Sequence, residues 1–211
     1  MDNYQKTFET WDKVAGLYQT KFMDLDMYDD TYARFCALIA KSPATILEIG
    51  CGPGNITKRL LANRPDFQVY AIDASPRMIE LAELNIPTAK FSVMDCRQIG
   101  SLTLKFDGII AGFCMPYLSK EDNQKLIADC ASLLRPGGIF YFSLIKGNYD
   151  NSGLMTASTG DQSYVYYYDE LFLQTEPGKN NFEIPEIIHR RSPASVSNQT
   201  EDMIFITRKP G

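Results

Sequence analysis

The stretch ILEIGCGPGNITKRL, residues 46–60, decides the fold, because an apolar run leads into a glycine-rich loop and then into a polar segment. The apolar residues 45–49 predict a buried strand, and residues 56–62 predict the helix that follows it. Glycines in the loop let the backbone turn tightly and let a ligand approach within van der Waals distance. Open α/β sheets bind ligands at the carboxyl ends of their strands, so this loop is a candidate ligand site.

The alternation of strand and helix continues along the chain. Apolar runs predict further strands at residues 68–72, 91–94, 106–111 and 139–145. Helices are predicted at residues 78–84 and 120–134. The sequence Arg135-Pro136-Gly137-Gly138 is typical of a stop followed by a turn. Near-continuous apolar strands that alternate with helices indicate a parallel sheet covered on both faces, which is an α/β fold.

The two ends of the chain add further elements. Apolar residues at three- and four-residue spacing predict an amphipathic helix over residues 8–22, and a second helix is predicted at residues 28–40. Gly, Asn, Ser, Thr and Asp dominate residues 146–160, which predicts a long mobile loop. A turn is predicted at residues 176–179. Two closing strands are predicted at residues 182–189 and 203–207, with a hairpin over residues 192–201.

The chain of 211 residues is 45% hydrophobic, which suits one domain with a sizeable core. We expect residues 1–42 to form a helical cap, residues 43–145 a cofactor-binding core, and residues 146–211 a loop and the closing strands. The start MDNYQKTFET lacks the basic and apolar blocks of a signal peptide, and no uncharged apolar stretch reaches about 18 residues. We therefore expect a cytoplasmic protein without a membrane partner.

Charge and residue usage argue against several kinds of site. Five scattered cysteines without a Cys-x-x-Cys pair, together with a single histidine, argue against a disulfide framework and against a metal site. The net charge is −5, and the largest basic cluster is the short segment at residues 189–191. Because duplex binding depends on neutralising many phosphates, this charge balance disfavours a nucleic-acid partner.

Three ligand classes fit a glycine-rich loop after a strand: a dinucleotide, a mononucleotide and an adenosyl compound. A phosphate-binding P-loop ends in Gly-Lys-Ser/Thr, whereas Gly54 is followed here by Asn55. A dinucleotide fingerprint reads Gly-x-Gly-x-x-Gly, whereas this loop reads Gly-x-Gly-x-Gly, and Pro53 has no N–H to donate to a pyrophosphate. The loop therefore favours a ligand without phosphate groups.

Two carboxylates follow the next strands of the predicted sheet. Asp73 ends the second strand, where a carboxylate can accept hydrogen bonds from both ribose hydroxyls of a nicotinamide dinucleotide or of an adenosyl ligand. Asp95 and Cys96 end the third strand, where the carboxylate can accept from an adenine amino group and the next N–H can donate to the ring. As an alternative, both aspartates can cap helices.

Five sequence features stand in a fixed order along the chain. They are Glu48-x-Gly50-x-Gly52-x-Gly54, Asp73, Asp95, FDGIIAGFCMPYLS at residues 106–119 and LLRPGGIFYFS at residues 133–143. In this order they resemble the class I S-adenosylmethionine-dependent methyltransferases, over about residues 4–144. The resemblance implies a three-layer, doubly wound, Rossmann-like sheet of seven strands, with the last strand antiparallel and with N-terminal cap helices. It also implies S-adenosylmethionine as the cofactor.

The resemblance implies a role for each matching residue. Those that would hold the methionine part of the cofactor are Glu48, Gly50, Cys51, Gly52, Gly54 and Phe113. Those that would hold the adenosine part are Asp73 at the ribose, Ala74 and Met78 at the adenine face, and Asp95 and Cys96 at the adenine edge. The segment WDKVAGLYQ resembles a cap helix in which Tyr18 would close over the cofactor and exclude water, while Trp11 is expected to serve packing.

A sulfonium methyl group is already activated, so the main task is to hold a nucleophile in line with it at about 3 Å. No dedicated catalytic residue is required, and the candidates to face a substrate are Tyr117, Tyr166 and Tyr168. Amino-directed nucleic-acid methylases of this fold carry Asn/Asp/Ser-Pro-Pro-aromatic where this chain has Cys-Met-Pro-Tyr at residues 114–117. We therefore predict methyl transfer to a small-molecule acceptor. The alternatives are a non-catalytic S-adenosylmethionine-binding protein and a nicotinamide-dependent reductase.

Overall fold

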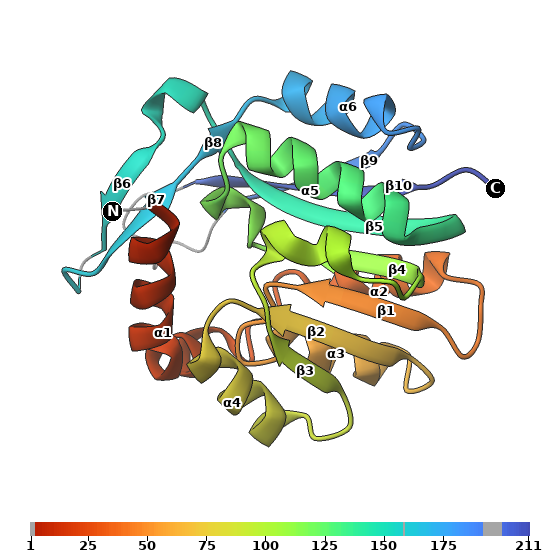
Figure 1. The fold of residues 1–211 in the computed structure, drawn as a ribbon, viewed down its shortest axis with the longest axis horizontal. Coiled ribbons are helices and arrows are strands. Elements are labelled where there is room, and N and C mark those ends of the chain that lie inside the picture. Colours follow the sequence, from red (N-terminus) through yellow and green to blue (C-terminus); the bar gives the residue numbers. More distant parts are fainter. Residues whose placement is uncertain (1–2, 158, 192–199) are drawn as a thin grey trace.

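The computed structural model describes residues 3–157, 159–191 and 200–211 (Figure 1). The helices are α1 (Asn3–Phe22), α2 (Asp29–Leu38), α3 (Asn55–Asn63), α4 (Pro76–Asn85), α5 (Lys120–Leu133) and α6 (Glu170–Lys179). The strands are β1 (Thr45–Ile49), β2 (Gln68–Asp73), β3 (Lys90–Val93), β4 (Phe106–Ala111), β5 (Leu134–Lys146), β6 (Gly153–Thr156), β7 (Gln162–Val165), β8 (Tyr167–Tyr168), β9 (Glu186–Arg191) and β10 (Glu201–Arg208). Short 3-10 helices are η1 (Cys96–Ser101), η2 (Met115–Tyr117) and η3 (Tyr149–Asn151).

The main sheet has the strand order β3-β2-β1-β4-β5-β10-β9. Strands β1 to β5 run parallel to one another, and β10 runs antiparallel to both β5 and β9. The two-residue strand β8 pairs in parallel with the end of β5. This order confirms the predicted Rossmann-like sheet with an antiparallel closing strand. It also places the ends of β1, β2, β3 and β4 side by side at one edge.

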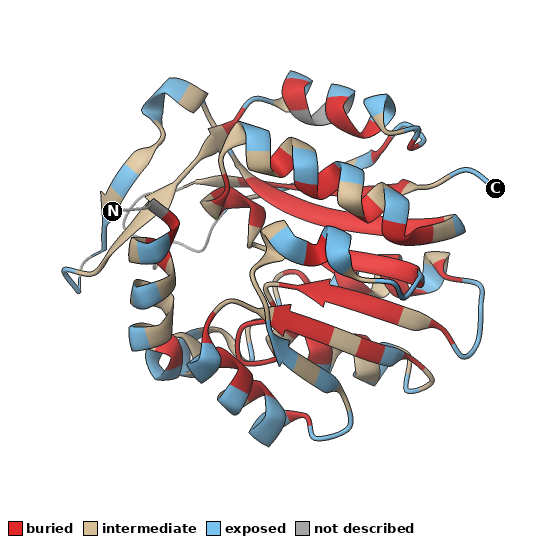
Figure 2. Ribbon diagram, in the orientation of Figure 1, coloured by how far each residue is buried: buried red, intermediate tan, exposed pale blue. Residues whose placement is uncertain are grey.

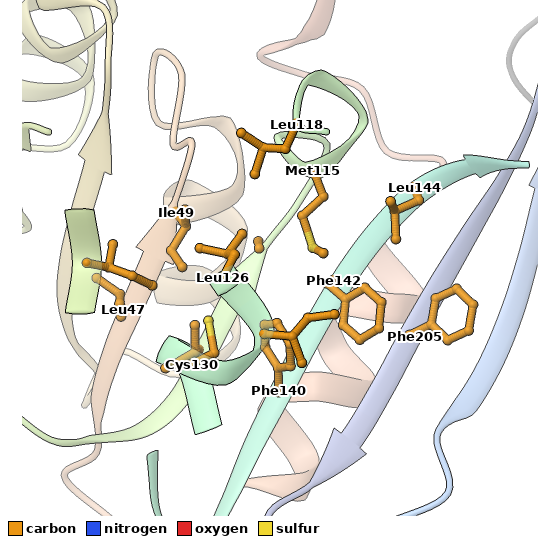
Figure 3. Close-up of a cluster of buried hydrophobic side chains, with 14 of the residues drawn as sticks. Leu47, Ile49, Met115, Leu118, Leu126, Cys130, Phe140, Phe142, Leu144 and Phe205 are labelled. Atoms are coloured by element: carbon orange, nitrogen blue, oxygen red, sulfur yellow. The ribbon is translucent and has the colours of Figure 1, made fainter. Parts of the chain in front are cut away.

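The sheet is the middle of three layers, because alternate residues of its strands face opposite sides. On one side, Leu47 and Phe140 pack with Leu126 and other side chains of α5 (Figure 3). On the other side, Ile46 and Tyr141 belong to a second buried cluster with side chains of α2, α3 and α4. Figure 2 shows that the central strands are buried along most of their length. A double-sided core of this kind explains why the strands read as continuous apolar runs.

Strand β5 begins earlier than the sequence predicts. Helix α5 ends at Leu133, next to the predicted stop. Residues 135–138 do not turn away, however, but form an irregular start of the strand, between the pairs Phe106↔Leu134 and Gly108↔Ile139. Gly137 has φ +76°, and its N–H donates to the carbonyl oxygen of Lys209 (2.9 Å). The residues of this bulge are not paired with β4. A proline and a left-handed glycine are tolerated there, because no ladder hydrogen bond to β4 is lost.

The predicted mobile loop at residues 146–160 was wrong. The described part of this segment contains η3 and β6, and β6 pairs with β7 in a two-stranded antiparallel hairpin. The hairpin packs beside α1 at the carboxyl edge of the main sheet (Figure 1). The sequence did not predict this hairpin because its strands are short and only partly buried, and they gain support from α1 (Figure 2).

The predicted turn at residues 176–179 was also wrong, because α6 continues through Pro177 and Gly178 to Lys179. A proline near the end of a helix removes one hydrogen bond, and the helix stops within one turn, so the cost stays local. The next strand then begins at Glu186, later than predicted, and pairs with β10 as the sequence predicts. The predicted hairpin turn lies at residues 192–199, outside the described residues. Within the described part, no helix has both the length and the hydrophobicity needed to span a membrane.

Candidate functional site

A cavity of about 130 Å³ lies at the carboxyl ends of the parallel strands, beside helix α1. Its walls come from the loops after β1, β2, β3 and β4 and from two helices. The loops contribute Gly50, Gly52, Asp73, Ala74, Ser75, Met94, Cys96, Gly112, Phe113, Cys114, Tyr117 and Leu118, and the helices contribute Thr7, Phe8, Trp11, Tyr18 and Met78. Four loops that are far apart in the sequence meet here because parallel strands share one carboxyl edge.

Gly50 and Gly52 bring bare backbone to the cavity. A Cβ atom at Gly50 would lie 2.4 Å from Cβ of Cys114, so a side chain here would collide with the turn after β4. Gly52 has φ +53°, and its N–H donates to Oδ2 of Asp73 (2.9 Å). The positive φ and the close approach explain why glycine stands at these two positions.

Gly54 and Cys51 lie behind the cavity wall and not on it. Gly54 has φ +88° and faces α4, where a Cβ atom would lie 2.5 Å from Cδ1 of Ile86. The thiol of Cys51 is buried and donates to the carbonyl oxygen of Gly52 (3.5 Å). The structure therefore shows packing roles for these two residues, and the ligand contact that the resemblance implies stays a prediction.

Asp73 stands at the end of β2 with both carboxylate oxygens held by backbone groups. Oδ2 accepts from Gly52 N–H, and Oδ1 accepts from Ser75 N–H, each at 2.9 Å. Burial raises the pKa of Asp73, and these hydrogen bonds oppose the rise. Each carboxylate oxygen has a further acceptor site. Because Asp73 lines the cavity, it can accept hydrogen bonds from two hydroxyls of a ligand.

Glu48 is fully buried beside the glycine loop but does not line the cavity. Its Oε2 accepts from Oγ1 of Thr57 (2.5 Å), whereas Oε1 has no partner among the described residues. Burial raises the pKa of Glu48 to about 8, with the charge of Asp73 adding to the rise and Thr57 opposing it. An orphaned buried oxygen of this kind is commonly satisfied by an ordered water or a ligand.

The two residues predicted at the adenine edge lie in different surroundings. Cys96 lines the cavity, and burial raises the pKa of its thiol to about 12. Asp95 is absent from the cavity wall: it caps η1 by accepting from Arg97 N–H (2.9 Å) and forms a salt bridge with the Arg97 guanidinium (2.5 Å). Arg97 also lies over the ring of Tyr4, 3.9 Å from its centroid. The capping alternative therefore describes Asp95 in this structure.

An aromatic cluster closes the cavity on the side of α1. The ring of Trp11 makes edge contacts with Tyr117 (5.2 Å between centroids) and with Tyr18 (5.6 Å). Burial raises the pKa of Tyr18 to about 12, and the charges of Asp73 and Glu48 add to the rise. Trp11 Nε1 is buried and has no partner in the described chain. Trp11, expected to serve packing, thus lies on the wall beside the two tyrosines named from the sequence.

The other two substrate-facing candidates do not line the cavity. Tyr168 is fully buried, and its hydroxyl donates to the carbonyl oxygen of Leu118 (2.6 Å) and accepts from Nδ2 of Asn123 (2.8 Å). Tyr166 stacks with Tyr149 (6.0 Å between centroids). The prediction that Tyr168 faces a substrate was wrong, because pairing of β8 with β5 turns this side chain into the core.

Polar contacts that the sequence did not reveal fix α1 on both sides of the cavity. Oδ1 of Asp12 accepts from Oγ of Ser75 (2.7 Å) and from N–H of Arg77 (2.9 Å), which attaches α1 to the start of α4. On the other side, Oγ1 of Thr10 donates to the carbonyl oxygen of Gln162 in β7 (2.6 Å). These contacts join residues far apart in the chain, so no local pattern could predict them.

The charge of the wall restricts what it can bind. Within the described part of the chain, the wall residues include no lysine or arginine, and Asp73 is their one carboxylate. Over the same residues, no group of three or more His, Cys, Asp or Glu side chains is arranged to hold a metal ion. The site therefore combines bare backbone, aromatic rings and one carboxylate, which suits an uncharged or cationic ligand that carries a diol.

Residues 46–138 match a protein family described as "Methyltransferase domain". Among curated proteins, a tRNA N(3)-methylcytidine methyltransferase of Schizosaccharomyces pombe is 29% identical over 178 residues, which cover 78% of this chain and 70% of that protein. A trans-aconitate 2-methyltransferase of Azoarcus sp. is 32% identical over 117 residues, which cover 54% of this chain and 45% of that protein. The chain thus spans less than half the length of the second relative.

Solved structures show the same fold. Magnesium protoporphyrin IX methyltransferase from Synechocystis PCC 6803, solved with bound S-adenosylmethionine, superposes with a TM-score of 0.71 at 15% identity over 99% of this chain and 98% of that one. The N-methyltransferase NodS from Bradyrhizobium japonicum, solved with S-adenosylhomocysteine, gives 0.64 at 20% identity over 89% and 90%. The chain therefore shares the fold of these two methyltransferases. The match to the family described as "Methyltransferase domain" covers residues 46–138, which is less than half of this chain.

Proposed function

We propose that this chain transfers a methyl group from S-adenosylmethionine to a small-molecule acceptor. The observation that carries the proposal is a row of wall residues along the sheet edge. The row runs from Cys96 after β3, past Asp73 after β2 and Gly52 after β1, to Phe113 after β4. Since neighbouring strands lie about 4.8 Å apart, the row is roughly 14 Å long. An extended adenosyl amino acid suits this length, with its base at β3 and its amino acid at β4.

The adenosine half is assigned to the β2 and β3 end of the row. Asp73 would accept hydrogen bonds from the two ribose hydroxyls, using the acceptor sites that Gly52 and Ser75 leave open. Met78 and Cys96 line the same end and offer apolar contact to a flat base. Glu48, whose Oε1 has no partner in the described chain, lies beneath the amino-acid half. These features fit the adenosyl group, and the wall residues that the structure describes include no lysine or arginine to repel its sulfonium.

When bound, the cofactor supplies an electrophilic methyl group. The chain then has to hold an acceptor in line with that group, which can supply roughly 7–11 kcal/mol of the barrier. The rings of Trp11, Tyr18 and Tyr117 exclude water from the reacting region. Asp73 is assigned to the ribose, so the described wall offers no further carboxylate as a base. The acceptor atom would therefore react as a nucleophile that needs no base from this wall.

Two features favour a small acceptor. Aromatic side chains of α1 cover the cavity, so an acceptor has to fit beneath this helix together with the cofactor. The absence of lysine and arginine from the described wall, together with a net charge of −5, offers little attraction to a polyanion. A tRNA acceptor is the second candidate, because the relative from Schizosaccharomyces pombe aligns over 78% of this chain.

Calorimetric titration with S-adenosylmethionine and S-adenosylhomocysteine tests cofactor binding, and we expect both to bind. Transfer of a labelled methyl group is then measured into total tRNA and into a panel of small amines, phenols and carboxylic acids. We expect label in the small molecules alone. If neither compound binds, the proposal is refuted. Label in tRNA would show that the acceptor is a nucleic acid and not a small molecule. Cofactor binding without methyl transfer in any reaction would favour the non-catalytic alternative.

A further inference from the structure

Phe113 is a bulky residue held at a positive φ on the cavity wall. Its φ is +61°, and among the described non-glycine residues only Phe113 and Asn181 have a positive φ. Asn181 follows the end of α6, where a left-handed residue is common, whereas Phe113 follows a strand. The left-handed conformation is strained for phenylalanine because Cβ crowds the backbone. Strain of this kind persists where the surroundings enforce it, and it is concentrated at functional sites.

The first constraint on Phe113 comes from β5. Oγ of Ser143 accepts from the N–H of Phe113 (2.8 Å). Ser143 is fully buried between the apolar residues Phe142 and Leu144. A hydroxyl in such a position is costly unless it is hydrogen-bonded, and the hydroxyl of Ser143 bonds to the turn after β4. The serine therefore ties the strained residue to the rigid centre of the sheet.

The second constraint comes from α2 and β10. The ring of Tyr28, the residue that precedes α2, packs against the ring of Phe113 with 4.7 Å between centroids. The hydroxyl of Tyr28 donates to Oδ2 of Asp202 (2.6 Å), and both residues are buried. Because Asp202 belongs to β10, the pair fixes the phenyl ring against the second side of the sheet.

The residues on either side of Phe113, Gly112 and Cys114, are packed too tightly for the turn to shift. A Cβ atom at Gly112 would lie 2.4 Å from Cδ1 of Ile56 in α3. Cβ of Cys114 lies 2.4 Å from the place a Cβ atom would take at Gly50. The turn is therefore pressed against α3 on one side and against the glycine loop on the other. Ser143 and Tyr28 thus contact Phe113 itself, while α3 and the glycine loop press against its two neighbours.

We propose that Ser143 and the pair Tyr28–Asp202 are positioning residues that hold Phe113 in its left-handed conformation, so that the turn after β4 fits the amino-acid end of the bound cofactor. This inference rests on the proposed function and deepens it at one end of the site. The adenosine end is formed at β2 and β3 by other residues, so it does not depend on the conformation of Phe113.

The first experiment compares two ligands on the variant Ser143→Ala. Loss of this hydrogen bond is expected to lower the affinity for S-adenosylhomocysteine about tenfold, and to change the affinity for adenosine, which lacks the amino acid, by less than about twofold. Calorimetry measures both affinities, and circular dichroism with thermal unfolding checks the fold. An equal loss for the two ligands, or no loss for either, overturns the proposal. If the unaltered protein binds neither ligand, the proposed function itself fails.

The second experiment asks whether Ser143 acts through Phe113. Glycine adopts a positive φ without strain, so the variant Phe113→Gly leaves no strained conformation to enforce. Adding Ser143→Ala to Phe113→Gly is expected to change the affinity for S-adenosylhomocysteine by less than about twofold. A full tenfold loss in the glycine background overturns the proposal, because Ser143 would then act without Phe113.

A matched pair of tyrosine variants tests the second constraint. Tyr28→Phe removes the hydroxyl that bonds Asp202, whereas Tyr141→Phe removes a buried hydroxyl that lies 3.0 Å from Oγ1 of Thr31. We expect Tyr28→Phe to lower the affinity for S-adenosylhomocysteine about threefold and Tyr141→Phe to leave it unchanged. Equal effects of the two variants would mean that a buried hydroxyl matters for packing alone, which overturns this part of the proposal.

Discussion

At the scale of single residues, Asp73 has the most defined geometry in the site. Backbone N–H groups of Gly52 and Ser75 hold its two oxygens, so the carboxylate is oriented before any ligand arrives. An oriented acceptor loses little side-chain entropy on binding, which favours affinity. The contrast with Asp95 is informative: both aspartates end strands, yet Asp95 is engaged by Arg97 and does not line the cavity.

The variants Asp73→Ala and Asp95→Ala should therefore differ. We expect Asp73→Ala to weaken binding of S-adenosylhomocysteine at least about tenfold, because two charge-assisted hydrogen bonds to the ribose are lost. Asp95→Ala should weaken it by less than about threefold. Calorimetry at one pH and salt concentration measures both. If Asp73→Ala and the unaltered protein bind S-adenosylhomocysteine with equal affinity, Asp73 does not bind the ribose.

Glu48 makes the stability of the fold depend on pH. Burial raises its pKa from the ordinary value of 4.5 to about 8, so the folded state favours the protonated, neutral form. Stability from this group is fully present below pH 4.5 and is lost as the pH rises towards 8. Glutamine at this position stays neutral at every pH. The stability of Glu48→Gln relative to the unaltered chain should therefore increase between pH 5.5 and pH 8.5.

Urea unfolding at several pH values measures this effect. Glu83→Gln, which changes an exposed side chain of α4, is the control and should follow the unaltered chain at each pH. If Glu48→Gln and Glu83→Gln show the same pH dependence, then Glu48 is not protonated in the folded chain.

At the scale of elements, helix α1 covers the cavity and is held by polar contacts at its sides. Asp12 connects it to the start of α4, two residues beyond Asp73, and Thr10 connects it to β7. A ligand that fills the row along the sheet edge needs more space than about 130 Å³, so α1 has to move outward for entry. These contacts set how readily it does so.

Asp12→Ala should loosen α1 without unfolding the protein. We expect faster amide hydrogen exchange in residues 3–22 and faster dissociation of S-adenosylhomocysteine, with a loss of unfolding free energy of about 1 kcal/mol. Exchange mass spectrometry and stopped-flow dissociation measure these changes. Glu9→Ala, on the same helix and bonded to Gln5, is the matched control. Unchanged exchange in α1 would show that the bond to Ser75 does not hold the helix.

Element prediction succeeded where burial imposes a pattern and failed where long-range contacts supply the stability. Strands β1 and β4 have the predicted bounds because apolar runs mark strands buried on both faces. The hairpin of β6 and β7 was missed because its strands are only four residues long and α1 supports them. The helix through Pro177 was missed because a local breaker signal was given too much weight.

At the scale of the whole molecule, the site is a consequence of the strand order. The order β3-β2-β1-β4 places four loops at one edge. In the proposed function, an adenosyl ligand would lie along these loops with its base at β3 and its amino acid at β4. The sequence predicts this edge, and the residues Asp73, Met78 and Phe113 do lie on the cavity wall. It could not predict that Gly54 serves helix packing or that Tyr168 turns into the core, because both depend on which elements become neighbours.

Because one ligand would contact the ends of four strands and α1, its binding should stabilise the whole chain. At a concentration one hundred times its dissociation constant, S-adenosylhomocysteine should add about 2.7 kcal/mol to the unfolding free energy. For a chain of this size that corresponds to a rise in unfolding midpoint of roughly 5–10 °C. The reduced nicotinamide dinucleotide should give no shift, because Pro53 removes an N–H that a pyrophosphate would use. Differential scanning fluorimetry compares the two, and a shift with the nicotinamide compound alone would favour the reductase alternative over methyl transfer.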